Sequence, residues 1–497
     1  MKHHQYSLAV SVLLFVLLEV LPSCSPRPHD AVRVDTLPPM FPDYADVTVP
    51  VDVAPLQFAL PDSVCDYLYV VACGTQADSV MASGQWADFD VDDWHRLLAA
   101  NRGHDITINV SARKDGHWYQ YRDFKVHVDT DSFGAWGLTY RRIAPGYESF
   151  GTMGLYMREF STFDERPIIE NTAVPSSCVN CHTAWGGNPQ AFTFHVRGAH
   201  GATLVQRNGQ REWLTTATDS TLGSCVYPYW HPSGRYIAYS TNLTHQAFSE
   251  VPSSVLEVFD TGSDVLIYDT QQHQLIEWPQ LATDEWMETY PSFSPDGRFL
   301  YYCTARKQTV PEGLDSVRYN ICRVSFDPEH GTVGERIDTL FDAEARGKSA
   351  IHPRPSYDGR WLLFTVADYG CFPIWHNESD QWLMDLESGE VRPLDEANSP
   401  RADSYHNWCP SGNGWVVFTS RRGDGRYSWL WLCRIDAQGH ATKPFLLPQR
   451  DPATYYGTSL YSFNTPDFTT APVDLDVRAA AQEIVSPDRI QVDYRRP

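Results

Sequence analysis

The stretch Tyr290-Pro-Ser-Phe-Ser-Pro-Asp-Gly-Arg298 is one copy of a turn motif that recurs along the second half of the chain. Pro presets the first central dihedral of a tight turn and Gly accepts a positive φ, so each copy predicts a turn between two strands. Aromatic and β-branched residues follow the copies, as is typical of strands. The other copies are Tyr227-Pro-Tyr-Trp-His-Pro-Ser-Gly-Arg235, His352-Pro-Arg-Pro-Ser-Tyr-Asp-Gly-Arg360, Tyr405-His-Asn-Trp-Cys-Pro-Ser-Gly-Asn413 and the degraded Leu460-Tyr-Ser-Phe-Asn-Thr-Pro-Asp467.

This repeat predicts an all-β fold in which each unit is a four-stranded propeller blade rather than a helical solenoid. The motifs resemble the W/F-S-P-D-G-R/K turn of TolB-type β-propellers over residues 192–468, and that resemblance implies a fold but no reaction. We expect five blades, with six as the alternative. The strand at 459–464 would close the last blade together with three strands at 191–198, 202–208 and 211–216, which leaves no open edge at the seam.

The residue two positions after each repeat start should recur at one place on the innermost strand. A polar ring at one mouth of the channel would suit ligand binding, although ordinary solvated lining is the alternative. These positions are Tyr229, Ser292, Arg354, Asn407 and Ser462. His231, His352 and His406 also lie near the turns, but they hold different positions within the unit, so we do not expect them to converge on a metal.

Composition sets limits on partners. The 497 residues allow two to four domains, and 42% hydrophobic with 20% charged residues is ordinary for a globular protein. The net charge of −23 repels phosphate backbones, so nucleic acid is not an expected partner.

The N-terminus predicts export. Basic residues precede an apolar stretch from Leu8 to Leu18, which is too short to span a bilayer comfortably. Leu21-Pro-Ser-Cys24 resembles the lipobox of bacterial lipoproteins, which implies a signal peptide over 1–23 and a lipid on Cys24; an ordinary cleaved signal is the alternative. We therefore expect a protein that is lipid-anchored in a bacterial cell envelope, on the periplasmic side.

The rest of the chain divides by composition. Residues 24–53 are rich in Pro and Asp and predict a flexible tether. Residues 54–145 predict a small β-sandwich-like domain with one helix over 90–101. We then expect a cofactor segment over 146–190, the propeller over 191–470 and a C-terminal tail over 471–497.

The motif Cys178-Val-Asn-Cys-His182 has the C-x-x-C-H spacing of c-type haem attachment. Cys178 and Cys181 would bind the two vinyl groups, and the His182 imidazole would bind the iron. Met153 is the first candidate for the sixth ligand, followed by Met157, His195 and His200. A zinc site or a redox disulfide is the alternative, but no second ligand pair at matching spacing occurs.

Haem and propeller together resemble bacterial envelope lipoproteins that are accessory to cytochrome c or nitrite-reductase systems. The resemblance implies one haem c, a role in electron transfer, and periplasmic or membrane redox proteins as partners; it names no catalytic residue. Two alternatives stay open: a scaffold or assembly factor without redox activity, and an enzyme that uses the propeller channel. No G-x-S-x-G nucleophile elbow supports the enzyme.

Overall fold

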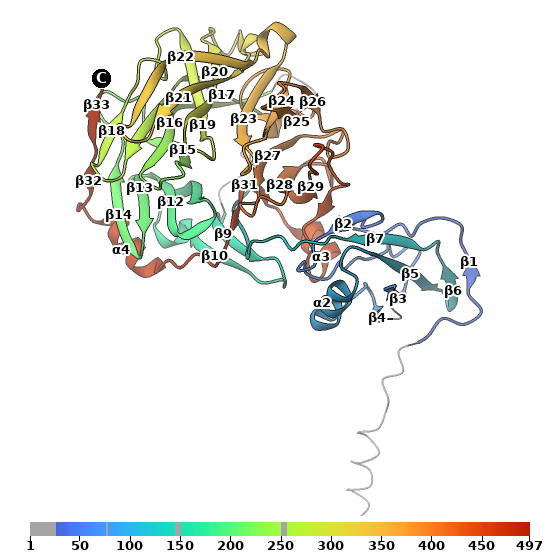
Figure 1. Ribbon diagram of the computed structural model, residues 1–497. Helices are drawn as coiled ribbons and strands as arrows, with labels where there is room; N and C mark the ends of the chain where they lie inside the picture. Colours follow the sequence, from blue (N-terminus) through green and yellow to red (C-terminus); the bar gives the residue numbers. More distant parts are fainter. Residues whose placement is uncertain (1–25, 76–77, 145–150, 250–255) are drawn as a thin grey trace, which may run out of the picture.

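The computed structural model describes residues 26–75, 78–144, 151–249 and 256–497. A large ring of sheets and a smaller N-terminal domain lie side by side (Figure 1). The predicted signal peptide and Cys24 lie outside the described residues. Among the helices of the described part, none is both long and apolar enough to cross a bilayer.

Within the described residues, six sheets of four or five strands surround a channel, so the fold is a six-bladed β-propeller. The expected five blades are wrong and the six-bladed alternative is confirmed.

The strands of each blade are given from the innermost outward. Blade 1 has β31 (Ser462–Thr469), β8 (Gly137–Ile143), β9 (Gly154–Glu159) and β10 (Glu165–Glu170); blade 2 has β11 (Ser177–Trp185), β12 (Asn188–Gly198), β13 (Ala202–Arg207) and β14 (Gln210–Thr215). Blade 3 has β15 (Cys225–Trp230), β16 (Tyr236–Phe248), β17 (Leu256–Asp269) and β18 (Gln274–Ile276); blade 4 has β19 (Trp286–Phe293), β20 (Phe299–Arg306), β21 (Asn320–Asp327) and β22 (Thr332–Phe341). Blade 5 has β23 (Ser349–Pro355), β24 (Trp361–Ala367), β25 (Asp380–Asp385) and β26 (Val391–Pro393); blade 6 has β27 (Asp403–Trp408), β28 (Trp415–Ser420), β29 (Trp429–Arg434) and β30 (Phe445–Leu446).

Each innermost strand carries the same bulge. One residue there has a left-handed backbone, and the ladder register shifts by one residue beside it. Pro often follows, because a bulge interrupts the ladder and needs no N–H at that point. The bulge residues are Cys181, Tyr227, Tyr290, His352, Tyr405 and Thr465, with φ of 51°, 50°, 51°, 56°, 48° and 46°.

The seam joins one C-terminal strand to three earlier ones, as expected, but the three strands are different. β31 pairs with β8, which continues to β9 and β10. The strands predicted for the seam are β12, β13 and β14, which form a blade of their own with β11. The propeller therefore begins at Gly137 rather than at 191, and the predicted cofactor segment 146–190 consists largely of blade strands. The repeat on β11 lacks the Ser/Asp-Gly turn, which is why the sequence count fell short by one blade.

The N-terminal domain is a single sheet with one helix rather than a sandwich. β5 (Asp105–Lys114) is central and pairs with β3, β6 and β7. Helix α2 (Val91–Ala100) is the predicted one: Asp90 caps it and Trp94, Leu97 and Leu98 are buried. The other strands are β1 (Val32–Arg33), β2 (Val47–Val49), β3 (Tyr67–Cys73), β4 (Ser79–Gly84), β6 (His117–Gln120) and β7 (Phe124–Val128).

Part of the predicted tether belongs to this domain. Val47 and Val49 in β2 are fully buried, and β2 pairs with β7. The alternation of apolar and polar residues in Val47–Val49 is typical of a half-buried strand, and it decides the local structure despite the Pro and Asp residues around it. The C-terminal tail is also folded: helix α4 (Val477–Val485) packs on blades 1 and 2, and β32 (Ile490–Gln491) and β33 (Asp493–Arg495) add parallel strands to blades 2 and 3.

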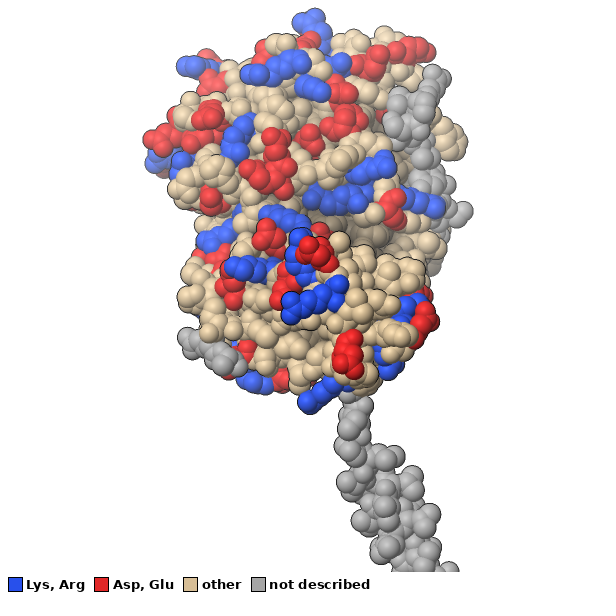
Figure 2. Space-filling view, turned by 90° about the vertical axis from the view of Figure 1, so that its right-hand side faces the viewer, with Lys and Arg blue, Asp and Glu red and all other residues tan. Residues whose placement is uncertain are grey.

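The N-terminal domain packs firmly on the propeller. Arg434 of blade 6 forms ion pairs with Asp129 and with Asp131, the latter at 2.9 Å. Phe133 packs on Trp415, with ring centroids 5.1 Å apart, and one apolar core includes residues of both parts. Lys and Arg are interspersed with Asp and Glu on the face that Figure 2 shows, so that face carries no large patch of one sign.

Candidate functional site

The C-x-x-C-H motif lies on β11, the innermost strand of blade 2. Cys178 and Val179 pair with Arg197 and Val196 of β12, and the bulge falls at Cys181. Cys181 therefore holds the repeat position of Tyr405, and His182 holds that of His406. Part of the motif is thus a sixth copy of the propeller repeat.

The two thiols and the imidazole lie in different places. Cys178 and Cys181 line a pocket at one mouth of the channel, and the Arg141 guanidinium donates to the Cys178 Sγ at 3.0 Å. The His182 side chain is only 6% exposed; its Nε2 bonds the Thr139 hydroxyl at 3.0 Å, between blades 1 and 2. Burial lowers the pKa of His182 to about 4, so the imidazole is neutral.

These positions do not fit haem c as predicted. A proximal ligand must offer a ring nitrogen to iron beside the attached edge of the porphyrin. Here Nε2 is occupied by Thr139, and Nδ1 is buried without a partner among the described residues. The pair of thiols is accessible from one pocket, but the expected iron ligand is packed away from it.

The candidate sixth ligands are not at this mouth either. Met153 lies just before β9 and is 2% exposed, and Met157 lies within β9 in the core between blades 1 and 2. His195 is buried with its Nδ1 3.0 Å from the Thr203 hydroxyl, and His200 is exposed in the turn after β12.

The zinc and disulfide alternatives also lack support. Val179 and Asn180 keep extended ladder positions, so the Cα atoms of Cys178 and Cys181 are about 10 Å apart, whereas a disulfide needs less than about 7 Å. Both thiols are free. The described residues contain no cluster of three or more His, Cys, Asp or Glu side chains that could hold a metal ion.

The channel contains a narrow cavity of about 50 Å³, which we call the waist. It is lined by residues from the innermost strands and has room for a few waters. His352 and His406 line this cavity together with His182, whereas His231 bonds the Gly297 carbonyl elsewhere. Burial holds the pKa of all three waist histidines low.

Three of the five predicted ring positions line the waist. Tyr229, Arg354 and Asn407 line the waist, while Ser292 donates to the Pro353 carbonyl at 2.7 Å. Ser462 lies at the thiol-containing mouth, because the last repeat starts at Thr465 rather than Leu460. The equivalent ring residues are Asp467 in blade 1 and Thr183 in blade 2, and Thr183 donates to the Asp467 Oδ2 at 3.0 Å.

The mouth that holds the thiols is basic, and we call it the arginine mouth after Arg141, Arg197 and Arg421. These arginines come from β8, β12 and the residue after β28, in blades 1, 2 and 6. The pocket has a volume of about 440 Å³, and no Asp or Glu lines it among the described residues. In a chain with 62 acidic and 39 basic residues, such a lining concentrates positive charge locally.

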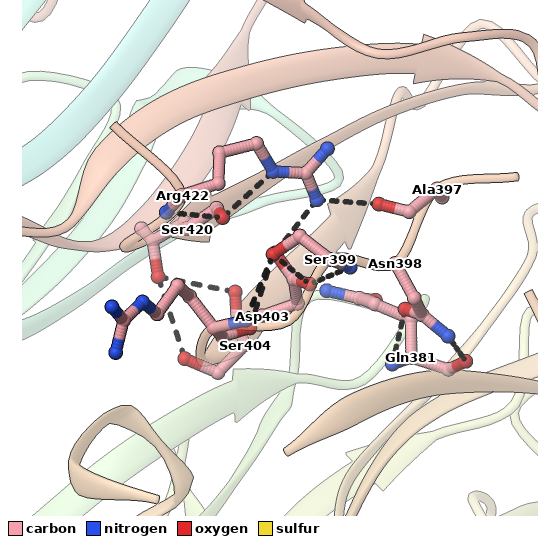
Figure 3. Close-up of polar contacts among 10 residues, drawn as sticks. Gln381, Ala397, Asn398, Ser399, Asp403, Ser404, Ser420 and Arg422 are labelled. Atoms are coloured by element: carbon pink, nitrogen blue, oxygen red, sulfur yellow. Dashed lines mark hydrogen bonds and ion pairs between the residues drawn. The ribbon is translucent and has the colours of Figure 1, made fainter. Parts of the chain in front are cut away.

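Neighbouring groups hold the arginines in place. The Asn180 amide oxygen accepts from the Arg197 Nε at 3.1 Å, in the orientation that satisfies both amide atoms. Arg421 lies over the Trp375 ring at 4.3 Å. The next residue, Arg422, forms a buried ion pair with Asp403 at 2.7 Å, and Ser399 also donates to that carboxylate (Figure 3).

One wall of this mouth is a hairpin longer than its counterparts. β16 and β17 continue past the blade, and His245 and Val258 line the pocket. Tyr369 of blade 5 donates to the Glu257 Oε1 at 2.9 Å, and His376 lies 3.8 Å from the other oxygen of that carboxylate. Phe372 and Trp375 of the same blade-5 loop complete an aromatic side.

Comparisons with known proteins do not name a family. No family model and no curated protein matches the chain. Among solved structures, the periplasmic gluconolactonase PpgL of Pseudomonas aeruginosa is 16% identical, with a TM-score of 0.33, over 67% of this chain and 100% of that one. Sqt1 of Chaetomium thermophilum is 11% identical, with a TM-score of 0.32, over 83% and 86%, and a DUF4784 family protein of Bacteroides caccae is 8% identical, with a TM-score of 0.31, over 73% and 97%. At such scores these likenesses carry no argument about activity, and the propeller assignment rests on the six sheets themselves.

Proposed function

We propose that this protein is a binding protein whose arginine mouth captures a small carboxylate with a ring-shaped or apolar body. The single observation that carries the proposal is a pocket of about 440 Å³ with three guanidiniums and no acidic lining residue in its described part. Arg binds carboxylates through paired N–H groups, and the aromatic side of the pocket suits an apolar body. The narrow waist keeps such a ligand at the mouth.

The test is calorimetric titration with benzoate and glucuronate, with benzylamine as the probe of opposite charge. We expect one or both carboxylates to bind and benzylamine not to bind. Arg197→Gln and Arg141→Gln should each weaken binding about tenfold, because a hydrogen bond to a charged group contributes about 1.5–3 kcal/mol. Arg336→Gln is the matched control, since that side chain is 89% exposed on blade 4. Equal binding by the double variant and the wild type would refute the proposal.

The cell-envelope location and the lipid on Cys24 are part of the proposal. They are supported by the basic start, the short apolar run and the lipobox-like ending. Intact mass measurement of membrane-extracted protein should give a chain that starts at Cys24 with added acyl mass, and Cys24→Ala should release the protein from membranes. The TolB-type subclass of propeller is likewise proposed from the turn motifs alone.

Haem c with electron transfer to envelope redox proteins is the second candidate. It is favoured by one observation, namely that Cys178 and Cys181 open into the same pocket. The packing of His182 counts against it. Protein made alongside a cytochrome c maturation system should decide: a haem-stained band that Cys178→Ala removes would establish attachment, and colourless protein of unaltered mass would exclude it.

A further inference from the structure

The opposite mouth of the channel is a second, chemically different pocket. It has a volume of about 240 Å³ and lies where the innermost strands end, on the far side of the narrow waist. Its lining combines five aromatic residues with four polar or charged ones, Thr183, Ser294, Asn407 and Asp467. We call it the tryptophan mouth after Trp185 and Trp230.

Trp185 forms a fixed aromatic wall. Its indole N–H donates to the Pro232 carbonyl of the next blade at 3.0 Å. The ring also lies against Gly234, where a Cβ would approach it to 3.2 Å. His231 makes the corresponding contact with Gly297 of blade 4, so this clasp joins neighbouring blades. His231 is buried, however, whereas Trp185 stays partly exposed and lines the pocket.

The polar groups at this mouth can take hydroxyls. The Asp467 carboxylate accepts from the Thr183 hydroxyl, the Ala184 N–H and the Asn407 amide, at 3.0, 3.3 and 2.9 Å. The Phe468 N–H also bonds this carboxylate, so a ligand hydroxyl would share one of its oxygens with a donor already present.

The charge balance argues against a cationic ligand. Arg354 lies in the waist with its guanidinium 5.1 Å from the Tyr229 ring, and its charge acts on Asp467. A second positive charge would be repelled by Arg354, and the Asp467 carboxylate repels an anion. The pocket therefore favours a neutral ligand that has an apolar face and several hydroxyls.

We propose that the tryptophan mouth binds the ring of a neutral carbohydrate, with the C–H face of the sugar stacked on Trp185 and a hydroxyl donating to Asp467. A sugar ring combines an apolar face with a rim of hydroxyl groups, and this pocket combines a fixed aromatic wall with the Asp467 carboxylate and the Asn407 amide. The site goes beyond the carboxylate site and does not depend on it, because the waist separates the two.

The test uses methyl β-D-glucopyranoside, N-acetyl-D-glucosamine and cellobiose, with titration calorimetry and saturation-transfer NMR. At least one should bind in the millimolar range. Trp185→Ala should weaken that binding about tenfold, and Trp185→Phe, which keeps a ring, by no more than about threefold. Trp286→Ala in blade 4 is the matched control, since that indole stacks with Arg306 and lies outside the pocket.

Three results would overturn the proposal. They are an absence of binding by all three sugars up to about 50 mM, equal binding by Trp185→Ala and wild type, or tighter binding of benzyltrimethylammonium than of any sugar. Thermal melting of each variant checks that the ring is intact. If Trp185→Ala melts early, Trp185→Phe decides: retained sugar binding supports the stacking site, and a loss with normal melting refutes it.

Discussion

Asp467 should make the stability of the ring fall as pH rises through the mildly acidic range. Its buried carboxylate joins blade 1 to Thr183 and Ala184 of blade 2 and to Asn407 of blade 6. Burial raises its pKa from 3.8 to about 6, against the opposing effects of the hydrogen bonds and of Arg354. The native protein therefore holds this proton more tightly than the unfolded chain does. This proton stabilises the native state fully below pH 3.8, and the stabilisation is lost as pH rises through about 6. It amounts to about 3 kcal/mol, because each unit of pKa difference corresponds to about 1.4 kcal/mol.

Asp467→Asn isolates this contribution, because the amide cannot ionise. Guanidinium denaturation of wild type and variant at pH 4 and pH 7.5, followed by tryptophan fluorescence, gives the free energy of unfolding in each case. Between these two pH values we expect the free energy of unfolding of the variant to rise by about 2 kcal/mol relative to that of the wild type, because at pH 4 the unfolded carboxyl is already partly ionised. Asp358→Asn is the matched control, since that turn carboxylate is exposed. A difference that stays constant within about 0.5 kcal/mol between the two pH values would refute the reasoning.

Three further changes test the packing and the arginine mouth. Arg158→Met should lower the free energy of unfolding, measured by thermal denaturation, by about 2–4 kcal/mol. The reason is that this fully buried guanidinium donates to the Pro448 carbonyl at 2.8 Å and so joins blade 1 to the chain after blade 6. An unchanged melting temperature would contradict this. Arg434→Ala should give the N-terminal domain a separate, earlier calorimetric transition, since its ion pairs with that domain are lost; a single unchanged transition would show that apolar packing suffices. Raising NaCl from about 50 to 500 mM should weaken carboxylate binding several-fold, because salt screens the charges of the arginines. A dissociation constant that does not change with salt would show that the ligand binds away from the arginines.

The propeller was readable from sequence where the turn chemistry was complete. Four copies keep Ser or Asp before Gly, and their spacing predicts blades. The other two copies are centred on Cys181 and Thr465, and neither is followed by the Pro-Ser/Asp-Gly turn. Their shared signal is a left-handed bulge residue, which only the backbone reveals. The sequence pattern placed the Thr465 copy five residues too early and missed the Cys181 copy, so the blade count was one short and the seam was assigned to the wrong strands.

The chemistry at the channel was harder to predict. A C-x-x-C-H string predicts three converging ligands only if the local backbone brings them to one side. Here an extended strand with a bulge keeps the His182 imidazole out of the pocket that both thiols line, although Cys181 also lines the waist with it. The arginine mouth gave no local signal at all. Arg141, Arg197 and Arg421 are far apart in sequence and belong to no repeat position, so only closure of the ring brings them to one pocket.

The ring is closed by a single C-terminal strand, β31, which can detach from the rest of its blade. It forms the inner strand of blade 1, although the other three strands of that blade come first in the propeller and β31 comes last. When β31 detaches, β8 presents an unpaired row of backbone N–H and C=O groups, and the same strand from a second molecule satisfies them equally well. Concentrated or partly unfolded protein should therefore exchange β31 between molecules and form domain-swapped dimers, in which the β31 of each molecule completes the ring of the other.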